Sequence, residues 1–162
     1  MRPSWYGGID CGRSALKVFA FNGVNPSEAV QLVLPNTLML MPQINDPSTL
    51  KAIELDQVRL GDVSYLGSHS AETLGDPGNV PVGMTDEWFH GPEHAAMIGI
   101  ALNQLAARDA RCVPATGGVM CGLPVSATRA DSGKAYKASL AAHLGMINPT
   151  VKLGRLDVSS QA

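Results

Sequence analysis

A strand–turn–strand segment from Gly8 to Lys17 constrains this chain more than any other stretch of its sequence. The run Gly8-Ile9-Asp10 leads into a turn at Gly12, and an apolar run follows directly after Lys17. Glycine has no Cβ, so the backbone at Gly12 can turn sharply and approach a ligand closely. The spacing leaves Asp10 and Lys17 at the ends of the two strands, where both side chains can face one anionic group.

The carboxylate of Asp10 decides which anion this turn can accept. A bare carboxylate repels phosphate, whereas a divalent cation between the two groups removes the repulsion. The pattern D-x-G-x-x-x-x-K therefore predicts a loop for the phosphates of a Mg-nucleotide. Taken alone, the motif also fits an ordinary β-hairpin that carries aspartate and glycine in its turn.

A second motif overlaps this turn. Residues 7–12, followed by Arg13 and Ser14, resemble a Walker A loop with arginine in place of lysine. A Walker A loop opens a helix, whereas residues 16–21 have the composition of a strand, and Asp10 would lie inside the anion cradle. The sequence therefore favours the strand–turn–strand interpretation.

Length, charge and cysteine content limit the class of protein. With 162 residues, 45% of them hydrophobic, the chain is typical of one globular domain. Its net charge of −2, without a basic cluster, argues against charge-driven binding to nucleic acid. The most apolar run, 29–41, is short and broken by Pro35, so we expect no membrane contact. Three cysteines without a C-x-x-C pattern favour a reduced, cytoplasmic setting.

Hydrophobic periodicity and turn residues predict the element order β-β-β, lobe, α-β-α-β. The expected strands are 6–10, 16–22, 29–34, 119–123 and 151–158. The expected helices are 93–108, with one apolar stripe, and 131–144, ended by Gly145 as its C-cap. Prolines and glycines interrupt residues 35–90, where we expect an inserted lobe containing a short hairpin around Gly61.

This order predicts an α/β fold of the ribonuclease-H-like type, with a mixed sheet, flanking helices and an inserted small lobe. We expect one domain over residues 1–162. Its core comprises residues 1–34 and 91–162, and its lobe comprises residues 35–90. With an aspartate at the end of the first strand, the actin-like ATPase and sugar-kinase superfamily is the natural comparison.

Three segments resemble motifs of the bacterial actin-like proteins, the ParM-like plasmid-segregation ATPases. The segment 8–17 resembles the first phosphate motif of that family. The segment 65–71 is similar to the family's V-G-x-x-A, with the usual acidic residue replaced. The segment 120–125 resembles its T-G-L-P-V, with Cys121 in place of threonine. Because these matches occur in family order over nearly the whole chain, the chain resembles the N-terminal domain of such a protein, actin-type domain I.

The resemblance implies a role for each matching residue of the turn. Asp10 would help to hold the water shell of Mg²⁺. Lys17 would neutralise the β- and γ-phosphate oxygens of ATP or GTP. Backbone N–H groups that face the phosphates would come from Gly12, Arg13 and Ser14, the last with its hydroxyl as an extra donor. In this mechanism the protein positions the nucleotide and stabilises charge while water attacks the γ-phosphorus.

Gln161 is the best match to the family's residue that orients the attacking water, although the proline that usually precedes that residue is missing. Family members close the site with a second D-x-G loop from a second domain. The only other D-x-G sequences here, 76–78 and 131–133, follow no apolar strand. We therefore expect this chain to be half of an ATPase, with the second nucleotide-binding domain absent. Filament formation, and contact with DNA through an adaptor, would belong to the full-length form.

Two other functions compete with this one. A truncated actin-like domain could act as a non-catalytic assembly module that caps filaments of a full-length relative. A ribonuclease-H-like nuclease could use Asp10, but that chemistry needs several carboxylates around two metal ions. Gly122 and Pro124 stand where a second carboxylate would be expected. The sequence therefore ranks the nuclease last.

Residues 90–94 match H-x-x-E-H, a zinc-protease motif that needs both histidines on one helix. Proline is tolerated only in the first helical turn, so Pro92 places His90 outside the helix that carries His94. We therefore reject zinc and expect two surface histidines at a helix entry.

Overall fold

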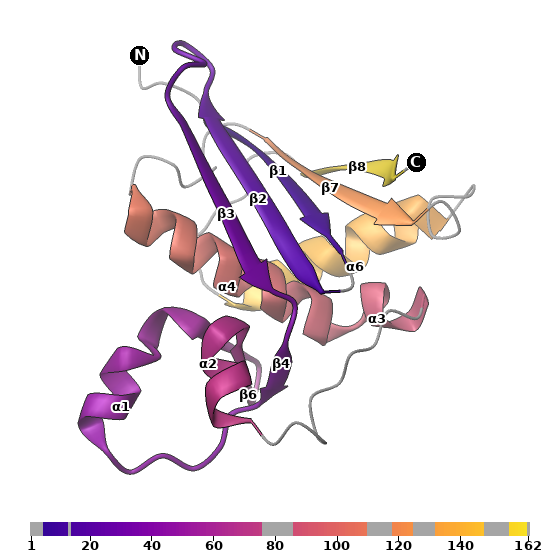
Figure 1. Cartoon of the computed structure of the whole chain (residues 1–162). Coiled ribbons are helices and arrows are strands. Elements are labelled where there is room, and N and C mark those ends of the chain that lie inside the picture. The colour runs from indigo at the N-terminus through magenta and orange to yellow at the C-terminus, as the bar shows by residue number, and fades with distance from the viewer. Residues whose placement is uncertain are drawn as a thin grey trace.

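The computed structural model describes residues 5–12, 14–75, 86–109, 118–124, 132–147 and 156–161. Its main layer is a five-stranded sheet with the order β3-β2-β1-β7-β8 (Figure 1). The first three strands are antiparallel neighbours, and β7 and β8 run parallel to β1. The strands are β1 (Trp5–Cys11), β2 (Ala15–Asn22), β3 (Ala29–Pro35), β7 (Val119–Pro124) and β8 (Leu156–Gln161). The mixed α/β fold predicted from the sequence is confirmed.

Alternating side chains give this sheet two different faces. In β2, Leu16, Val18 and Ala20 are buried, whereas Lys17 and Phe19 between them are exposed. Successive residues of a strand point to opposite faces, so each strand contributes one buried row and one exposed row. Helices α4 (Pro92–Arg108) and α6 (Ser132–Ile147) lie on the buried side (Figure 1).

Helix α4 is the centre of the hydrophobic core. The expected apolar stripe is confirmed, but burial extends further, because every residue from 94 to 102 is buried. The helix contacts β2 and β3 of the main sheet and also β5 and β6 of a second, smaller sheet. A helix that packs against two sheets needs more than one apolar face.

The inserted segment forms the second sheet, with the strand order β4-β6-β5. Its strands are β4 (Leu38–Leu40), β5 (Gln57–Leu60) and β6 (Val63–Gly67), and the expected hairpin turns at Gly61, where φ is +63°. The remaining elements are α1 (Pro47–Ala52), the 3-10 helix η1 (Glu54–Asp56), α2 (Ser68–Leu74) and α3 (Asp86–His90). Leu38, Val58 and Tyr65 belong to the same hydrophobic cluster as the main sheet. This lobe therefore shares the core of the domain.

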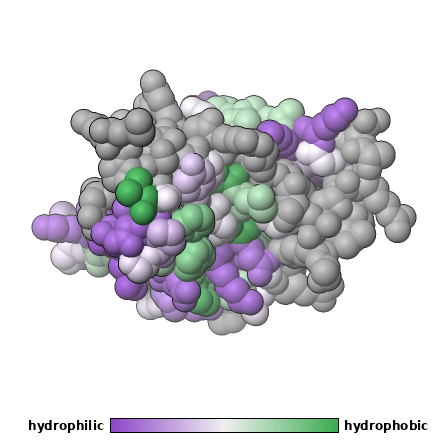
Figure 2. Space-filling model, turned by 90° about the horizontal axis from the view of Figure 1, so that it is seen from above, coloured by the Kyte–Doolittle hydropathy of each residue, from purple (hydrophilic) through white to green (hydrophobic). Residues whose placement is uncertain are grey.

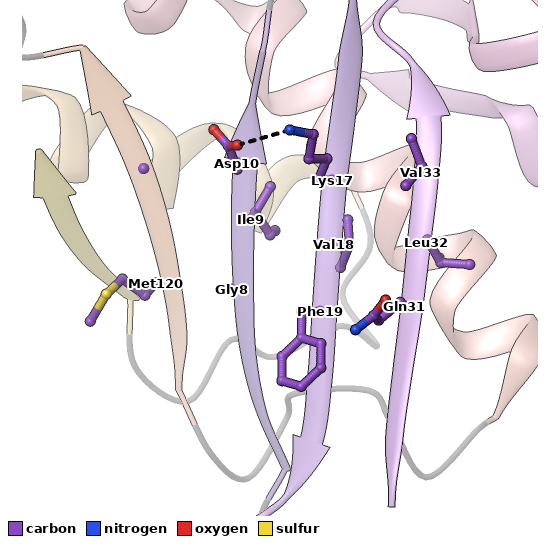
Figure 3. Close-up of a pocket in the computed structure, with 11 residues that line it drawn as sticks. Gly8, Ile9, Asp10, Lys17, Val18, Phe19, Gln31, Leu32, Val33 and Met120 are labelled. Carbon is purple, nitrogen blue, oxygen red and sulfur yellow. Dashed lines mark ion pairs between the residues drawn. The ribbon is translucent and has the colours of Figure 1, made fainter. Parts of the chain in front are cut away.

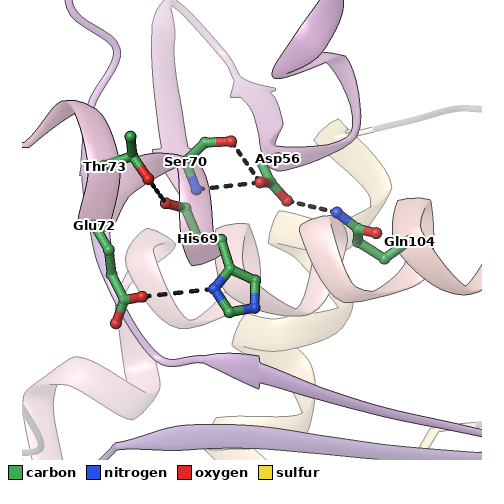
Figure 4. A network of polar contacts seen from close by, with 6 residues as sticks. All are labelled: Asp56, His69, Ser70, Glu72, Thr73 and Gln104. Carbon is green, nitrogen blue, oxygen red and sulfur yellow. Dashed lines mark hydrogen bonds and ion pairs between the residues drawn. The ribbon is translucent and has the colours of Figure 1, made fainter.

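A buried carboxylate also ties the lobe to α4 (Figure 4). Asp56 is 8% exposed and accepts hydrogen bonds from the backbone N–H and the hydroxyl of Ser70 in α2. Its other oxygen accepts from Nε2 of Gln104 in α4, at 2.6 Å. Since a buried carboxylate is stable only when its lone pairs are satisfied, these bonds hold η1, α2 and α4 together.

Gly67 marks the closest approach between the lobe and α4. A Cβ at this position would lie 2.5 Å from Cδ1 of Ile100 and 3.1 Å from Sδ of Met97. Real Cβ atoms do not approach other atoms so closely, so packing requires glycine at this end of β6. This contact gives a physical reason for the glycine of the segment 65–71.

We expect Gly67→Ala to lower the free energy of unfolding by about 1–3 kcal/mol, because the added methyl group overpacks the contact with α4. Gly145 provides a matched control, since a Cβ there meets nothing within 4 Å. Gly145→Ala should raise stability by up to about 1 kcal/mol through helix propensity. Urea unfolding followed by circular dichroism measures both changes. Equal effects of the two substitutions would contradict the packing argument.

Two predicted element boundaries are wrong. Helix α6 continues through Gly145 to Ile147, and among the described glycines only Gly61 has a positive φ. Gly145 is therefore an exposed residue inside the helix and not its C-cap. The last strand spans Leu156–Gln161 and so continues past its predicted end at residue 158, whereas residues 151–155 of the predicted strand lie outside the described residues. No helix in the described part of the chain is long and apolar enough to cross a membrane.

The expectation of two surface histidines is wrong for His94. His90 ends α3 and His94 lies in α4, so the predicted break between them is confirmed. However, His94 is 1% exposed, its Nε2 shares a hydrogen bond with the Tyr136 hydroxyl, and the rings of Trp88 and Phe89 pack against it. Burial, and secondarily the charge of His90, lower the pKa of His94 to about 3.

This lowered pKa makes stability depend on pH. Below the ordinary pKa of 6.5 the unfolded chain binds a proton that folded His94 does not, so stability falls as pH falls from about 6.5 towards 3. The slope reaches at most about 1.4 kcal/mol per pH unit. His94→Phe keeps an aromatic ring but removes the titration, so its free energy of unfolding should converge on that of wild type as pH falls. A constant difference between pH 7 and pH 4 would show that His94 does not titrate in this way.

Candidate functional site

Asp10 and Lys17 lie opposite each other on β1 and β2, as the sequence predicts (Figure 3). The Lys17 Nζ is 3.9 Å from Oδ2 of Asp10, and the two side chains are 65% and 50% exposed. Exposed ion pairs of this kind contribute about 0–1 kcal/mol to stability. A charged ligand can therefore separate the two groups at little energetic cost.

The pair lies at one end of a hollow on the exposed face of the main sheet, here named the sheet hollow (Figure 3). Its volume is about 460 Å³. It is lined by Gly8, Ile9, Asp10, Lys17, Val18, Phe19, Gln31, Leu32, Val33, Met120 and Gly122. Asp10 and Lys17 are the charged members of this described lining, so one end of the hollow is polar and the remainder is mostly apolar.

Gly12 forms the turn between the two strands. Its N–H donates to the carbonyl of Ala15 at 2.9 Å, and a Cβ at Gly12 would lie 3.0 Å from that same oxygen. The absence of a side chain therefore allows the turn to close. Because this N–H is already hydrogen-bonded, the role of Gly12 is to let the backbone turn. The backbone N–H groups of Arg13 and Ser14 remain as the predicted donors to phosphate.

Asn36 holds the turn from the other side. Its Nδ2 donates to the Gly12 carbonyl at 2.8 Å, and its backbone N–H donates to the Ser14 carbonyl at 3.0 Å. The residue is 8% exposed, and its buried Oδ1 has no partner among the described residues. Sequence reasoning missed Asn36, and its only local signal is a position directly after Pro35, at the end of an expected strand.

The remaining predicted residues lie at varying distances from the pair. Ser14 is exposed at the turn, whereas Arg13 lies outside the described residues. Gln161 is the last residue of β8, two strands away from β1 and at the same end of the sheet as Asp10. From the register, the two Cα atoms are about 12 Å apart. The structure therefore brings Asp10, Gly12, Ser14 and Lys17 together and places the backbone of Gln161 at the same end of the sheet.

Two buried thiols lie on the opposite face of the sheet, beneath the site. Burial is the main reason that the pKa of Cys11 is raised, with smaller effects of Cys121 and Asp10. Burial also raises the pKa of Cys121 to about 12. Both thiols therefore stay neutral and unreactive at physiological pH.

The pair of Asp10 and Lys17 suits a divalent cation that binds together with an anionic ligand. In the described part of the chain, no group of three or more histidine, cysteine, aspartate or glutamate side chains is placed to hold a metal ion. Asp10 alone offers a carboxylate in the sheet hollow, which fits Mg²⁺, an ion that keeps several waters and is held by few carboxylates plus phosphates. Two-metal nuclease chemistry has no second carboxylate in the described lining of this hollow.

A comparison with solved structures identifies the fold. No family model and no curated protein matches the chain. The apo pSK41 ParM protein matches with a TM-score of 0.61 and 12% identity, over 98% of this chain and 50% of that one. ParM of Bacillus thuringiensis in apo form matches with a TM-score of 0.55 and 15% identity, over 99% of this chain and 46% of that one.

The architecture is thus that of an actin-like α/β domain. More particularly, it is the fold of ParM, shared over nearly the whole of this chain. The chain spans about half the length of the ParM chains that it matches. At this sequence identity the likeness shows the fold, and the site must be argued from its own residues.

We expect Asn36→Ala to destabilise the protein by about 1–3 kcal/mol, because the partly buried Gly12 carbonyl loses its donor. The Gly12 amide should also exchange with solvent faster, since the turn loses one of its two restraints. Asn25→Ala is the control, because Asn25 makes its side-chain hydrogen bonds at the exposed turn between β2 and β3. Urea unfolding and amide exchange by NMR measure these effects. An unchanged Gly12 exchange rate in Asn36→Ala would contradict the role of Asn36.

Proposed function

We propose that this chain is the N-terminal half of an actin-like, filament-forming nucleotide hydrolase of the plasmid-segregation type. In this proposal it supplies the first phosphate loop of a Mg-ATP or Mg-GTP site. The observation that carries the proposal is the Asp10–Lys17 pair beside the Gly12 turn, on a fold shared with ParM. Filament contacts, and a link to DNA through an adaptor, belong to the complete protein.

Each residue of the turn has a chemical role in this proposal. Asp10 accepts hydrogen bonds from water around the cation, and it repels a phosphate that arrives without one. Lys17 places a positive charge, 3.9 Å from that carboxylate, beside the phosphate oxygens. Mg²⁺, when bound, neutralises charge on the phosphates. Gln161, at the same end of the sheet, orients the attacking water.

The proposal assigns the other half of the site to a second domain. A second phosphate loop and the base pocket would come from that domain, so the 162 residues alone should bind nucleotide weakly and hydrolyse little of it. Away from Asp10 and Lys17, Gln31 is the one side chain of the described lining that could donate a hydrogen bond to the edge of a nucleotide base. The phosphates are thus the main determinants of binding by this half.

The role of Asp10 predicts opposite effects with and without Mg²⁺. With Mg²⁺ present, Asp10→Asn should weaken ATP binding, because a partner of the hydrated cation is lost. With Mg²⁺ removed by EDTA, the same variant should bind ATP more tightly than wild type, because the repulsion between carboxylate and phosphate is gone. Lys17→Ala should weaken binding about tenfold in both conditions. NMR titration measures weak binding and locates the shifted amides.

Lys51→Ala provides the matched control, because Lys51 lies on α1 in the lobe, away from the turn. Its binding should equal that of wild type. Asp10→Asn that weakens binding equally with and without Mg²⁺ would remove Asp10 from its proposed role. Tight binding and steady turnover by the wild-type chain alone would contradict the proposal of a half-site.

A further inference from the structure

Among the described residues, the outer edge of β3 has no strand partner, and its backbone groups follow a defined pattern. β3 is the terminal strand of the five-stranded sheet, and β2 is its neighbour on one side. The N–H of Asn22 donates to the Glu28 carbonyl at 3.1 Å, and the N–H of Asn36 donates to the Ser14 carbonyl at 3.0 Å. These two bonds join directly opposed residues, one at each end of β3, so they fix which residues bond to β2.

Because hydrogen-bonded and non-hydrogen-bonded pairs alternate in an antiparallel ladder, Val30, Leu32 and Leu34 bond to β2. Their neighbours Ala29, Gln31 and Val33 therefore direct their N–H and C=O groups away from β2. No described strand pairs with this edge. The same three residues carry exposed side chains, and Val33 is 65% exposed.

From Ala29 to Leu34, this edge lacks the charges and prolines that commonly protect a sheet edge. Native edge strands carry charges, especially lysine, or prolines and bulges that prevent pairing with other chains. Residues 29–35 contain no charge, and their single proline is the last residue. Seen from above, the hydrophobic areas of the described surface lie between hydrophilic ones (Figure 2). A strand edge binds by backbone hydrogen bonds and needs no broad apolar patch.

We propose that the outer edge of β3 pairs antiparallel with β3 of a second copy of this chain. A two-fold axis at Gln31 places Gln31 opposite its own copy and Ala29 opposite Val33, so the outward N–H and C=O groups of both strands bond to each other. No like charges meet, because the strand is uncharged. Pro35 has no N–H and ends the ladder at both sides.

The flanking turn is compatible with this pairing. Glu28, the nearest charged residue, accepts hydrogen bonds from Asn22 Nδ2 at 3.2 Å and Asn25 Nδ2 at 3.3 Å. Its carboxylate is thus engaged within its own turn. The contact uses the same surface of both copies, so it closes at two copies. Gln31 and Val33 also line the sheet hollow, but the pairing uses the outward backbone groups of β3 and does not rest on the proposed function.

The interface is small, so the dimer should be weak. We expect sedimentation equilibrium of the full chain to show a monomer–dimer equilibrium at about 10–100 µM, with or without Mg-ATP. Val33→Lys places a charge on the edge and should weaken the dimer at least about tenfold. Gln31→Pro removes one outward N–H without touching the bonds to β2, and should have the same effect. Val24→Lys, at a turn residue that is 79% exposed, should leave the dimer unchanged.

Cysteine cross-linking tests the register itself, in a Cys112→Ser background. Gln31→Cys should form a disulfide-linked dimer under mild oxidation, because opposed residues of an antiparallel pair have Cα atoms about 5.5 Å apart. Ala29→Cys should not, because the two copies of residue 29 lie four residues apart along the ladder, at about 13 Å or more. A chain that stays monomeric through this concentration range, or a dimer that survives both edge substitutions, overturns the proposal.

Discussion

The register of β1 between β2 and β7 determines where Asp10 and Lys17 lie. Asp10 is opposite Lys17 on one side and Gly122 on the other. Strand side chains alternate with a period of two, so a slip of one residue would move Asp10 and Lys17 into the core and expose Ile9 and Val18. The burial of that hydrophobic row therefore fixes the charged pair at the mouth of the sheet hollow. The same alternation places the outward groups of β3 on the sheet edge.

Much of this arrangement could be predicted from local sequence patterns. Period-two alternation, turn residues and helical spacing are properties of short segments. They therefore predicted the first three strands, the hairpin at Gly61 and the helix that ends at Arg108. The juxtaposition of Asp10 and Lys17 follows from the short turn between them. Each of these predictions depends on residues fewer than twenty positions apart.

The parts that failed depend on contacts distant in sequence. His94 is buried because Tyr136, 42 residues later, provides its hydrogen-bond partner, and nothing near His94 in the sequence signals that partner. Asn36 bonds to Gly12 across 24 positions, so a search confined to the turn could not find it. The prediction of Gly145 as a helix C-cap was wrong for the opposite reason. A valid local rule for helix ends was applied to a helix that continues for two more residues.

The position of α4 has a consequence for the modularity of this domain. One helix surface packs on the main sheet and another packs on the lobe, with Gly67 against Ile100 and Asp56 bonded to Gln104. The lobe therefore has no boundary at which it could be cut out or exchanged without also replacing the helix wall that it shares. A chimera that takes its lobe from a relative must take the matching residues of α4 as well. The inserted segment and α4 therefore have to be exchanged together, although the residues that join them, such as Gly67 and Ile100, are more than thirty positions apart in the sequence.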